Sequence, residues 1–231
     1  MDGLFSHVHD ATVRTLGVNG VAVGETLGQG CCGALHAHAG LTDDARALAR
    51  ANIAAFAGGD IPIVVNSAGC GAMLKEYGHL LPNDPAATAF AARVRDVTEL
   101  LAERGPAPGA ALDLRIAYDP PCHLLHAQGV AEPPRRVLGA VPGAVLVETP
   151  GASRCCGSAG LYGLVQPELS RTVLAAKLEE LRAAAPDVVA TGNPGCQLQI
   201  GAGLAAAGIA VDVRHPVELL DRSYAAAGFY A

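Results

Sequence analysis

The chain has 231 residues and a net charge of −6, with 51% hydrophobic and 16% charged residues. This composition suits a buried core, argues against disorder, and leaves room for two domains of about a hundred residues each. The chain has no basic run, so we expect no nucleic-acid partner. It has no uninterrupted apolar stretch of about eighteen residues, so we expect no transmembrane segment. Residues 1–7 lack the features of a signal peptide, so we expect a cytoplasmic protein.

Short β-type runs alternate with helical patterns along the first part of the chain. Asp43 and Asp44 are placed to cap a helix that begins near Ala45, and residues 61–66 form an apolar run typical of a buried strand. Asn83 or Asp84, followed by Pro85, predicts a helix start. The apolar residues that follow recur at spacings of three to four and predict one continuous helix: Phe90, Val94, Val97 and Leu101.

The Gly- and Pro-rich residues 105–110 predict a break between two halves, 1–105 and 112–231. Beyond the break we expect strands at 114–118, 144–147, 188–190 and 209–213. We expect helices at 167–184 and directly after His215-Pro216. The residues expected to face inward are Leu169, Val173, Leu174, Leu178, Leu181, Val217, Leu219 and Leu220. This alternation predicts an α/β fold of two tandem similar domains, each with a small, mainly parallel sheet flanked by helices.

The seven cysteines follow one pattern that occurs nearly twice. Cys31-Cys32-Gly33 recurs 124 residues later as Cys155-Cys156-Gly157, and Cys70 recurs 126 residues later as Cys196. The seventh, Cys122, precedes the second triplet, and its counterpart would lie just before Met1. We therefore expect an N-terminally incomplete first half, so that the chain is a fragment or starts at an internal methionine.

The predicted elements bring these thiols together. Cys70, Cys122 and Cys196 each follow a predicted strand, and both triplets lie in Gly-rich loops before a helix. Sites in parallel sheets gather at the carboxyl ends of the strands, so we expect one cluster of cysteines per half in these loops. In a cytosolic chain such thiols indicate metal binding or redox chemistry.

The second half offers four thiolates, the number that a four-iron cluster takes: Cys122, Cys155, Cys156 and Cys196. Adjacent cysteines can reach two irons of a cluster, whereas structural zinc sites pair cysteines a few residues apart. We therefore expect one [4Fe-4S] cluster in this half. The first half has Cys31, Cys32 and Cys70, which leaves room for a non-cysteine ligand, an empty site, or a ligand that precedes Met1. The alternative is that the cysteines are small buried core residues.

Histidines accompany both cysteine sets. His36 and His38 follow the first triplet, and His123 and His126 follow Cys122. They can serve as hydrogen-bond donors, proton carriers or a replacement ligand, or they can cap helices and lie half-exposed. The structural role is favoured for His38 and His126, and both roles stay open for His36 and His123. We expect His215 to end a strand. No carboxylate pair and no dinucleotide fingerprint is present, so no catalytic residue is assigned.

Four segments resemble the cysteine-rich CCG domains: residues 28–36, 119–123, 154–160 and 192–196. These domains occur in the iron–sulfur subunit of glycolate oxidase, in the catalytic B subunit of heterodisulfide reductase and in lactate-utilisation proteins. The closing residues 215–220 favour the glycolate oxidase subunit, whose C-terminal part the chain resembles. The ferredoxin-like region of that subunit has no counterpart here.

The resemblance implies an iron–sulfur electron-transfer subunit, or part of one, of a glycolate or other 2-hydroxy acid dehydrogenase. It implies a flavin in a partner subunit rather than in this chain, an acceptor such as a quinone, and a cytoplasmic position, peripheral at the inner face of the membrane through partners. Such a chain is not expected to be catalytic alone. Two alternatives stay open: a thiol–disulfide reductase resembling heterodisulfide reductase, and a non-catalytic metal-binding module.

Overall fold

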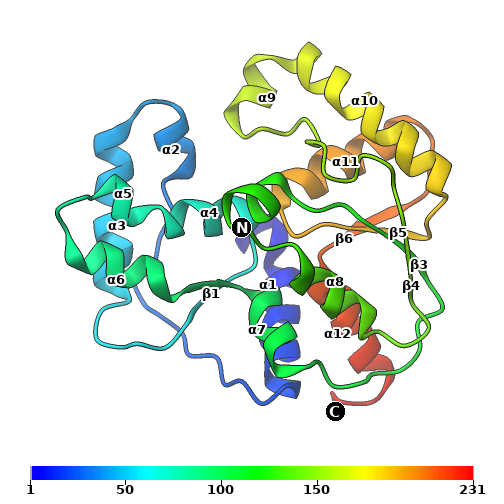
Figure 1. Ribbon diagram of the computed structural model, residues 1–231, viewed down its shortest axis with the longest axis horizontal. Helices are drawn as coiled ribbons and strands as arrows, with labels where there is room; N and C mark the ends of the chain where they lie inside the picture. The colour runs from blue at the N-terminus through cyan, green and yellow to red at the C-terminus, as the bar shows by residue number, and fades with distance from the viewer. Residues whose placement is uncertain (1, 231) are drawn as a thin grey trace.

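The structure is a computed structural model that describes residues 2–230. Met1, considered above as an internal start, lies outside the described residues. In Figure 1 the first half occupies the left and centre, and the larger sheet lies on the right. No helix of residues 2–230 is long and apolar enough to cross a membrane.

Short strands are interspersed among helices along the described chain. The first half comprises α1 (Asp2–Val18), α2 (Ala34–His38), α3 (Thr42–Ala55), β1 (Ile63–Val65), α4 (Ala68–Lys75), α5 (Tyr77–Leu80), α6 (Pro85–Arg93), β2 (Val94–Asp96) and α7 (Val97–Arg104). The second comprises β3 (Arg115–Tyr118), the π-helix η1 (His123–Ala127), α8 (Glu132–Gly139), β4 (Val145–Val147), α9 (Leu161–Val165), α10 (Pro167–Ala184), β5 (Val188–Ala190), α11 (Pro194–Ala206), β6 (Asp212–Arg214) and α12 (Pro216–Ala226).

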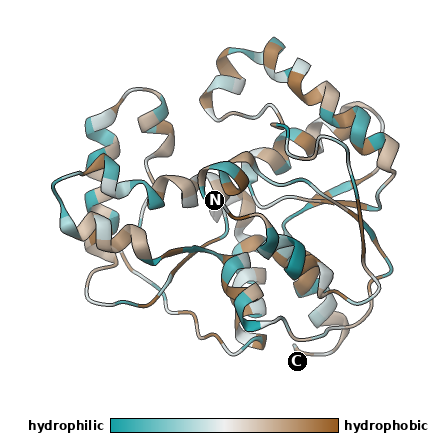
Figure 2. Cartoon of the chain, in the orientation of Figure 1, coloured by the Kyte–Doolittle hydropathy of each residue, from teal (hydrophilic) through white to brown (hydrophobic). Residues whose placement is uncertain are grey.

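The second half is a three-layer arrangement around a parallel sheet of order β4-β3-β5-β6. Its strands carry mostly hydrophobic residues (Figure 2), because both faces of the sheet are covered. Alternate residues point to opposite faces. Ile116 and Val188 pack with α8 and α12, whereas Ala117 and Val189 pack with α10 and α11. The predicted α/β class, with small parallel sheets between helices, is confirmed.

The first half has a smaller sheet, formed by the parallel strands β1 and β2. Its core includes Ile63, Tyr77 and Phe90, with the rings of Tyr77 and Phe90 stacked at a centroid distance of 5.2 Å. Within residues 2–230 the first half thus has two strands where the second has four.

A third core joins the two halves. Helix α1, from the start of the chain, packs beside α12, from its end (Figure 1). Val8 and Leu101 of the first half are buried together with Val137, Leu220 and Tyr224 of the second half. Arg14 and Asp221 form a bidentate ion pair between α1 and α12, with N–O distances of 2.9 and 2.7 Å. The two halves therefore share buried apolar surface and form a single folded body.

The continuous helix predicted through Phe90 and Leu101 is wrong. The chain leaves α6 at Arg93, forms strand β2 against β1, and enters α7 at Val97. Val94 and Val97 are buried, as the pattern required, but a strand separates them. Asp96 makes the new helix start, because its side chain accepts a hydrogen bond from the Thr98 N–H and forms a capping box with Glu99.

Three further details differ from the sequence expectations. Asp43 and Asp44 do not cap α3, because the helix already starts at Thr42 and both lie inside its first turn. Leu169 is 49% exposed rather than inward, although α10 has the predicted bounds. The last strand covers Asp212–Arg214 rather than 209–213.

Candidate metal centre

The cysteines lie where strands give way to helices. Cys70 and Cys196 lie in the first turns of α4 and α11, which follow β1 and β5, and Cys122 directly precedes η1 after β3. The two triplets lead into α2 and α9. The segments that carry these thiols therefore meet at the carboxyl ends of parallel strands, as the sequence pattern predicted.

The four thiols of the second half form one connected group. Cys122 and Cys156 both act on the pKa of Cys155, and the Sγ atoms of Cys156 and Cys196 are 3.1 Å apart. Cys156 and Cys196 are buried, and Cys122 and Cys155 are partly exposed.

Nitrogen donors point at the same sulfurs. The Gly157 N–H donates to Cys155 Sγ at 3.3 Å, and Asn193 Nδ2 donates to Cys196 Sγ at 3.5 Å. Donors of this kind stabilise thiolate charge and orient metal ligands.

The interactions among these thiols shift their pKa values in opposite directions. Those from Cys122 and Cys156, together with the Gly157 N–H and the positive charge of Lys177, lower the pKa of Cys155 to about 2. The same interactions and burial raise the pKa of Cys122 and of Cys156 above their usual range. The proton is therefore lost most easily from Cys155, and a metal bound to this group would have to displace the protons of its neighbours.

The first half repeats this geometry with fewer thiols. The hydrogen bond from Cys32 lowers the pKa of Cys70 to about 6, with a further contribution from the Ser67 side chain. The same contact, with burial, raises the pKa of Cys32. The Gly33 N–H donates to Cys31 Sγ at 3.5 Å, as Gly157 does to Cys155. Cys31 itself is exposed.

The donor set of the second half suits an iron–sulfur group. It combines four thiols from three separate segments with two nitrogen donors at the sulfurs. No three His, Cys, Asp or Glu side chains of the described chain form a group that could hold a single metal ion.

The two cysteine centres adjoin each other. Asn193, whose amide nitrogen reaches Cys196, accepts a hydrogen bond from the Gly69 N–H at 3.0 Å through its Oδ1. The Ala68 N–H donates to the Gly192 carbonyl at 3.0 Å. A chain of short contacts therefore links the residue beside Cys70 to Cys196 across the boundary of the halves.

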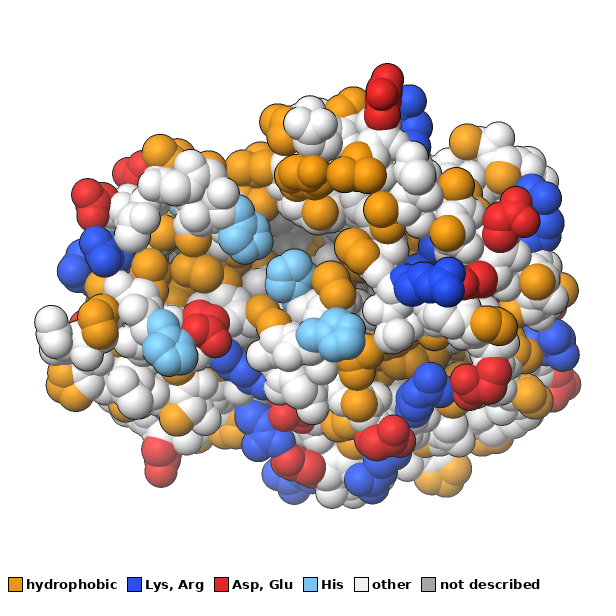
Figure 3. Space-filling view, turned by 45° about the horizontal axis from the view of Figure 1, so that its top comes forward, with side chains coloured by type: hydrophobic (Ala, Val, Ile, Leu, Met, Phe, Trp, Pro, Cys, Tyr) orange, Lys and Arg blue, Asp and Glu red, His pale blue; other side chains and the backbone are white. Residues whose placement is uncertain are grey.

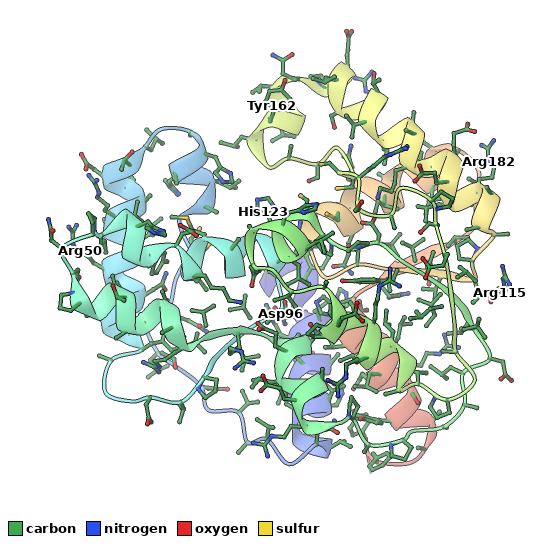
Figure 4. All side chains as sticks on the ribbon, in the orientation of Figure 1. Arg50, Asp96, Arg115, His123, Tyr162 and Arg182 are labelled. Atoms are coloured by element: carbon green, nitrogen blue, oxygen red, sulfur yellow. The ribbon has the colours of Figure 1, made fainter. Side chains whose placement is uncertain are left out.

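Histidines also meet at this boundary. His123 lies on η1 in the centre of Figure 4. Its ring stacks on that of His38 from α2, with centroids 6.3 Å apart. Burial and the nearby His38 lower the pKa of His123, and Cys155 offsets part of this shift. Figure 3 shows histidine and hydrophobic side chains beside each other in the middle of this face.

The histidines of the cysteine motifs and His215 differ in exposure and in hydrogen bonding. His126 is exposed, as is His38 at the surface side of its stack. His36 Nδ1 is buried without a hydrogen-bond partner. His215 follows β6 and caps α12, since its Nδ1 accepts from the Val217 N–H at 3.1 Å.

Sequence reasoning missed a buried ion pair behind the second centre. Lys177 is 2% exposed, and its Nζ lies 2.6 Å from Asp119 Oδ1 and 2.8 Å from the Ala152 carbonyl oxygen. The signal was its helical phase, because Lys177 continues the inward row of Ser170, Leu174 and Leu181 on α10.

Comparison with known proteins agrees with this cysteine pattern. The family model described as "CCG: Cysteine-rich domain" matches residues 1–75 and 116–201. A probable glycolate oxidase iron-sulfur subunit of Bacillus subtilis (strain 168) is 37% identical over 99% of this chain and 53% of its own length. Lactate utilization protein A of Geobacillus kaustophilus (strain HTA426) is 32% identical, with 96% of this chain and 95% of that protein covered.

A third relative carries a different name. It is the B subunit of fumarate reductase (CoM/CoB) from Methanothermobacter marburgensis, 36% identical over 93% of this chain and 42% of its own length. The chain thus spans about half the length of the glycolate oxidase relative and nearly all of lactate utilization protein A. With the family model matched over most of its residues, the chain belongs to the family of CCG cysteine-rich domain proteins.

Proposed function

We propose that the chain is an iron–sulfur electron-transfer subunit, or part of one, of a glycolate or other 2-hydroxy acid dehydrogenase. It comprises two cysteine-rich domains, 1–105 and 112–231. Cys122, Cys155, Cys156 and Cys196 of the second bind a [4Fe-4S] cluster. Cys31, Cys32 and Cys70 of the first form a related site with one thiol fewer, which holds a second cluster if another ligand completes it.

The observation that carries the proposal is the connected group of four thiols in the second half. Its members come from the loop after β3, the loop before α9 and the first turn of α11, so the folded chain brings distant residues to one place. Relatives named as iron-sulfur subunits support the same cofactor.

The residues around the sulfurs have defined tasks. A bound cluster supplies one-electron redox chemistry. Cys155 provides the first thiolate, the Gly157 N–H and the Asn193 amide hold sulfurs in place, and the buried Cys156 and Cys196 limit access of water.

The partner is a flavin-containing dehydrogenase subunit, which takes electrons from the hydroxy acid, and the acceptor is a quinone or similar carrier. The names of the relatives, glycolate oxidase and lactate utilization, support a 2-hydroxy acid as the substrate of the assembly. The assembly is cytoplasmic and lies at the inner face of the membrane through its partners.

Anaerobic reconstitution with iron and sulfide tests the cofactor. We expect about four irons per chain with the visible and EPR spectra of a four-iron cluster. Cys155→Ser removes the thiol whose pKa is lowered by its neighbours Cys122 and Cys156, and should abolish this iron. The matched variant Cys31→Ser, at the equivalent position of the first half, should leave it in place. A chain that retains zinc but no iron would contradict the proposal and leave a non-catalytic metal-binding module.

A thiol–disulfide reductase is the second candidate, supported by the relative named as a fumarate reductase (CoM/CoB). The partial exposure of Cys122 and Cys155 leaves an approach to the sulfurs for a substrate. The reconstituted chain would then reduce a disulfide in the presence of a reduced electron donor. Cluster formation without such turnover favours electron transfer.

A further inference from the structure

Lys177 and Asn52 occupy equivalent positions in the two halves. Helices α3 and α10 start 125 residues apart, at Thr42 and Pro167, as β1 and β5 do at Ile63 and Val188. Asn52 and Lys177 are the eleventh residues of α3 and α10, and both are nearly fully buried. The same place in the fold therefore holds a neutral amide in one half and an ammonium in the other.

Both side chains fasten the segment that carries the triplet. Asn52 accepts a hydrogen bond from the Gly30 N–H at 2.8 Å and donates to the Cys31 carbonyl at 3.0 Å. Lys177 donates to the carbonyl of Ala152, three residues before Cys155. The position thus has one task in the two halves, which is to fix the backbone that leads into the paired cysteines.

The further contacts of the two side chains differ, since Asn52 donates to the Tyr77 hydroxyl and Lys177 reaches a carboxylate. Lys177 pairs with Asp119, which lies three residues before Cys122, and Thr191 Oγ1 hydrogen-bonds to the same carboxylate at 3.4 Å. The ammonium therefore connects the segments that lead to Cys122 and Cys155, and Asp119 extends this connection to Thr191, which follows β5 on the way to Cys196. The charge of Lys177 acts on Cys155 through the low-dielectric interior.

We propose that Lys177 is the positioning residue of the second cysteine centre, and that its buried charge raises the reduction potential there, which Asn52 does not do in the first half. This rests on the proposed function, since it assumes a cluster on Cys122, Cys155, Cys156 and Cys196. The reduced form of such a cluster carries one more negative charge than the oxidised form, so a fixed cation nearby favours it.

The test compares chains that differ only at the ammonium. Asp119→Asn keeps Lys177 and an acceptor for it but removes the counter-ion of the ammonium, so all potentials are compared at pH 6, on the acid side where the ammonium stays protonated. Asp119→Asn/Lys177→Met removes the ammonium without leaving an unpaired buried carboxylate. Asp119→Asn/Lys177→Gln removes the charge but keeps a donor near Ala152, and it covers the case in which the Met variant does not fold. Arg171→Met, which removes an exposed charge from the same helix, is the control.

Two quantities are measured after anaerobic reconstitution: the reduction potential of the EPR signal that Cys155→Ser abolishes, and the rate of iron loss to a chelator. We expect both double variants to have more negative potentials than Asp119→Asn. The Met variant should also lose iron several-fold faster, and the Gln variant less so. Arg171→Met should match the unmodified chain in both quantities.

The outcomes separate the two proposals. Iron bound with equal potentials in Asp119→Asn and the double variants overturns the role of the charge, even if iron is lost faster. Iron lost at equal rates from Asp119→Asn and the Met variant overturns the positioning role. No iron in the unmodified chain overturns the proposed function itself and this inference with it.

Discussion

The two cysteine centres have the same arrangement of helices and loops but differ in their thiols and in the buried side chain beside them. Equivalent helices begin 125 residues apart, a glycine N–H donates to the first cysteine of each triplet, and a third cysteine lies in the first turn of a helix. The first half has three thiols and a neutral Asn52, and the second has four thiols and the buried Lys177. The backbone geometry is thus the same in the two halves, while the buried charge beside the cysteines differs.

The third residue of each triplet offers the strongest test of the shared framework. Gly33 and Gly157 both have positive φ, at 84° and 87°. A Cβ at Gly157 would lie 2.4 Å from the Ser170 carbonyl oxygen, and one at Gly33 would lie 3.3 Å from that of Ala45. We expect Gly157→Ala to cost about 4 kcal/mol of unfolding free energy, against about 1–2 kcal/mol for Gly33→Ala.

Urea unfolding of the metal-free, reduced chain measures both values. Gly139→Ala, in α8 with open space around its Cβ, is the control. Equal losses for the two triplet glycines would mean that the tighter approach in the second half does not constrain the backbone.

The helices that follow the last strand of each half differ in the charge of their caps. Asp96 caps α7 and His215 caps α12, both nearly fully buried and both in capping boxes with a glutamate. Burial raises the pKa of Asp96 to about 6 and lowers that of His215 to about 3. At pH values between the shifted and the ordinary pKa, Asp96 is protonated in the folded chain and ionised in the unfolded chain. In its own range, His215 is neutral in the folded chain and protonated in the unfolded chain.

The two caps therefore give opposite pH dependences. Stability from Asp96 falls as pH rises from about 4 to 6, and stability from His215 falls as pH drops from about 6.5 to 4, each by about 3 kcal/mol over that range. Asp96→Asn and His215→Asn each keep a capping side chain but remove one titrating group. The stability of Asp96→Asn should therefore fall only as pH drops, and that of His215→Asn only as pH rises. Urea unfolding at several pH values between 4 and 7 measures the slopes. Parallel curves for the two variants would contradict the assignment.

The smallest expected effect concerns the contact between the centres. Asn193 and Ser67 precede equivalent helices. Asn193 hydrogen-bonds to Cys196 and Ser67 lowers the pKa of Cys70, but of the two only Asn193 also bonds to the other half through its side chain, at the Gly69 N–H. Asn193→Ser should keep the sulfur contact and lose the bridge, at a cost of about 1 kcal/mol. Faster hydrogen exchange at the Gly69 amide would report the loss, and Ser67→Ala should leave that amide unchanged.

Much of each half could be predicted from the sequence. The strand at 188–190 and the helix at 167–184 have the expected bounds, because their apolar periods arise within a single element. Asp84 caps α6 as its position before Pro85 indicated. The placement of the cysteines followed from the same local patterns, since each lies at the end of a strand or before a helix.

Contacts between elements could not be predicted in the same way. The spacing of Val94, Val97 and Leu101 fits one continuous helix as well as two helices separated by β2. Only the pairing of β2 with β1 decides between these two structures. The bridge from Asn193 to Gly69 and the stack of His38 on His123 depend on how the halves pack, and no periodicity records that. A lysine in a helix is usually solvent-exposed, which concealed Lys177.

The common core of α1, α7, α8 and α12 has a consequence for how such a protein can diverge. Both halves contribute residues such as Val8, Leu101 and Tyr224 to this stabilising core, which lies away from the loops that bear the thiols. A buried charge can therefore be exchanged beside one cysteine centre while the joint core keeps the whole chain folded. Duplication followed by fusion through a joint core frees one cofactor site to change its task, whereas two independently folding copies would each have to remain stable alone.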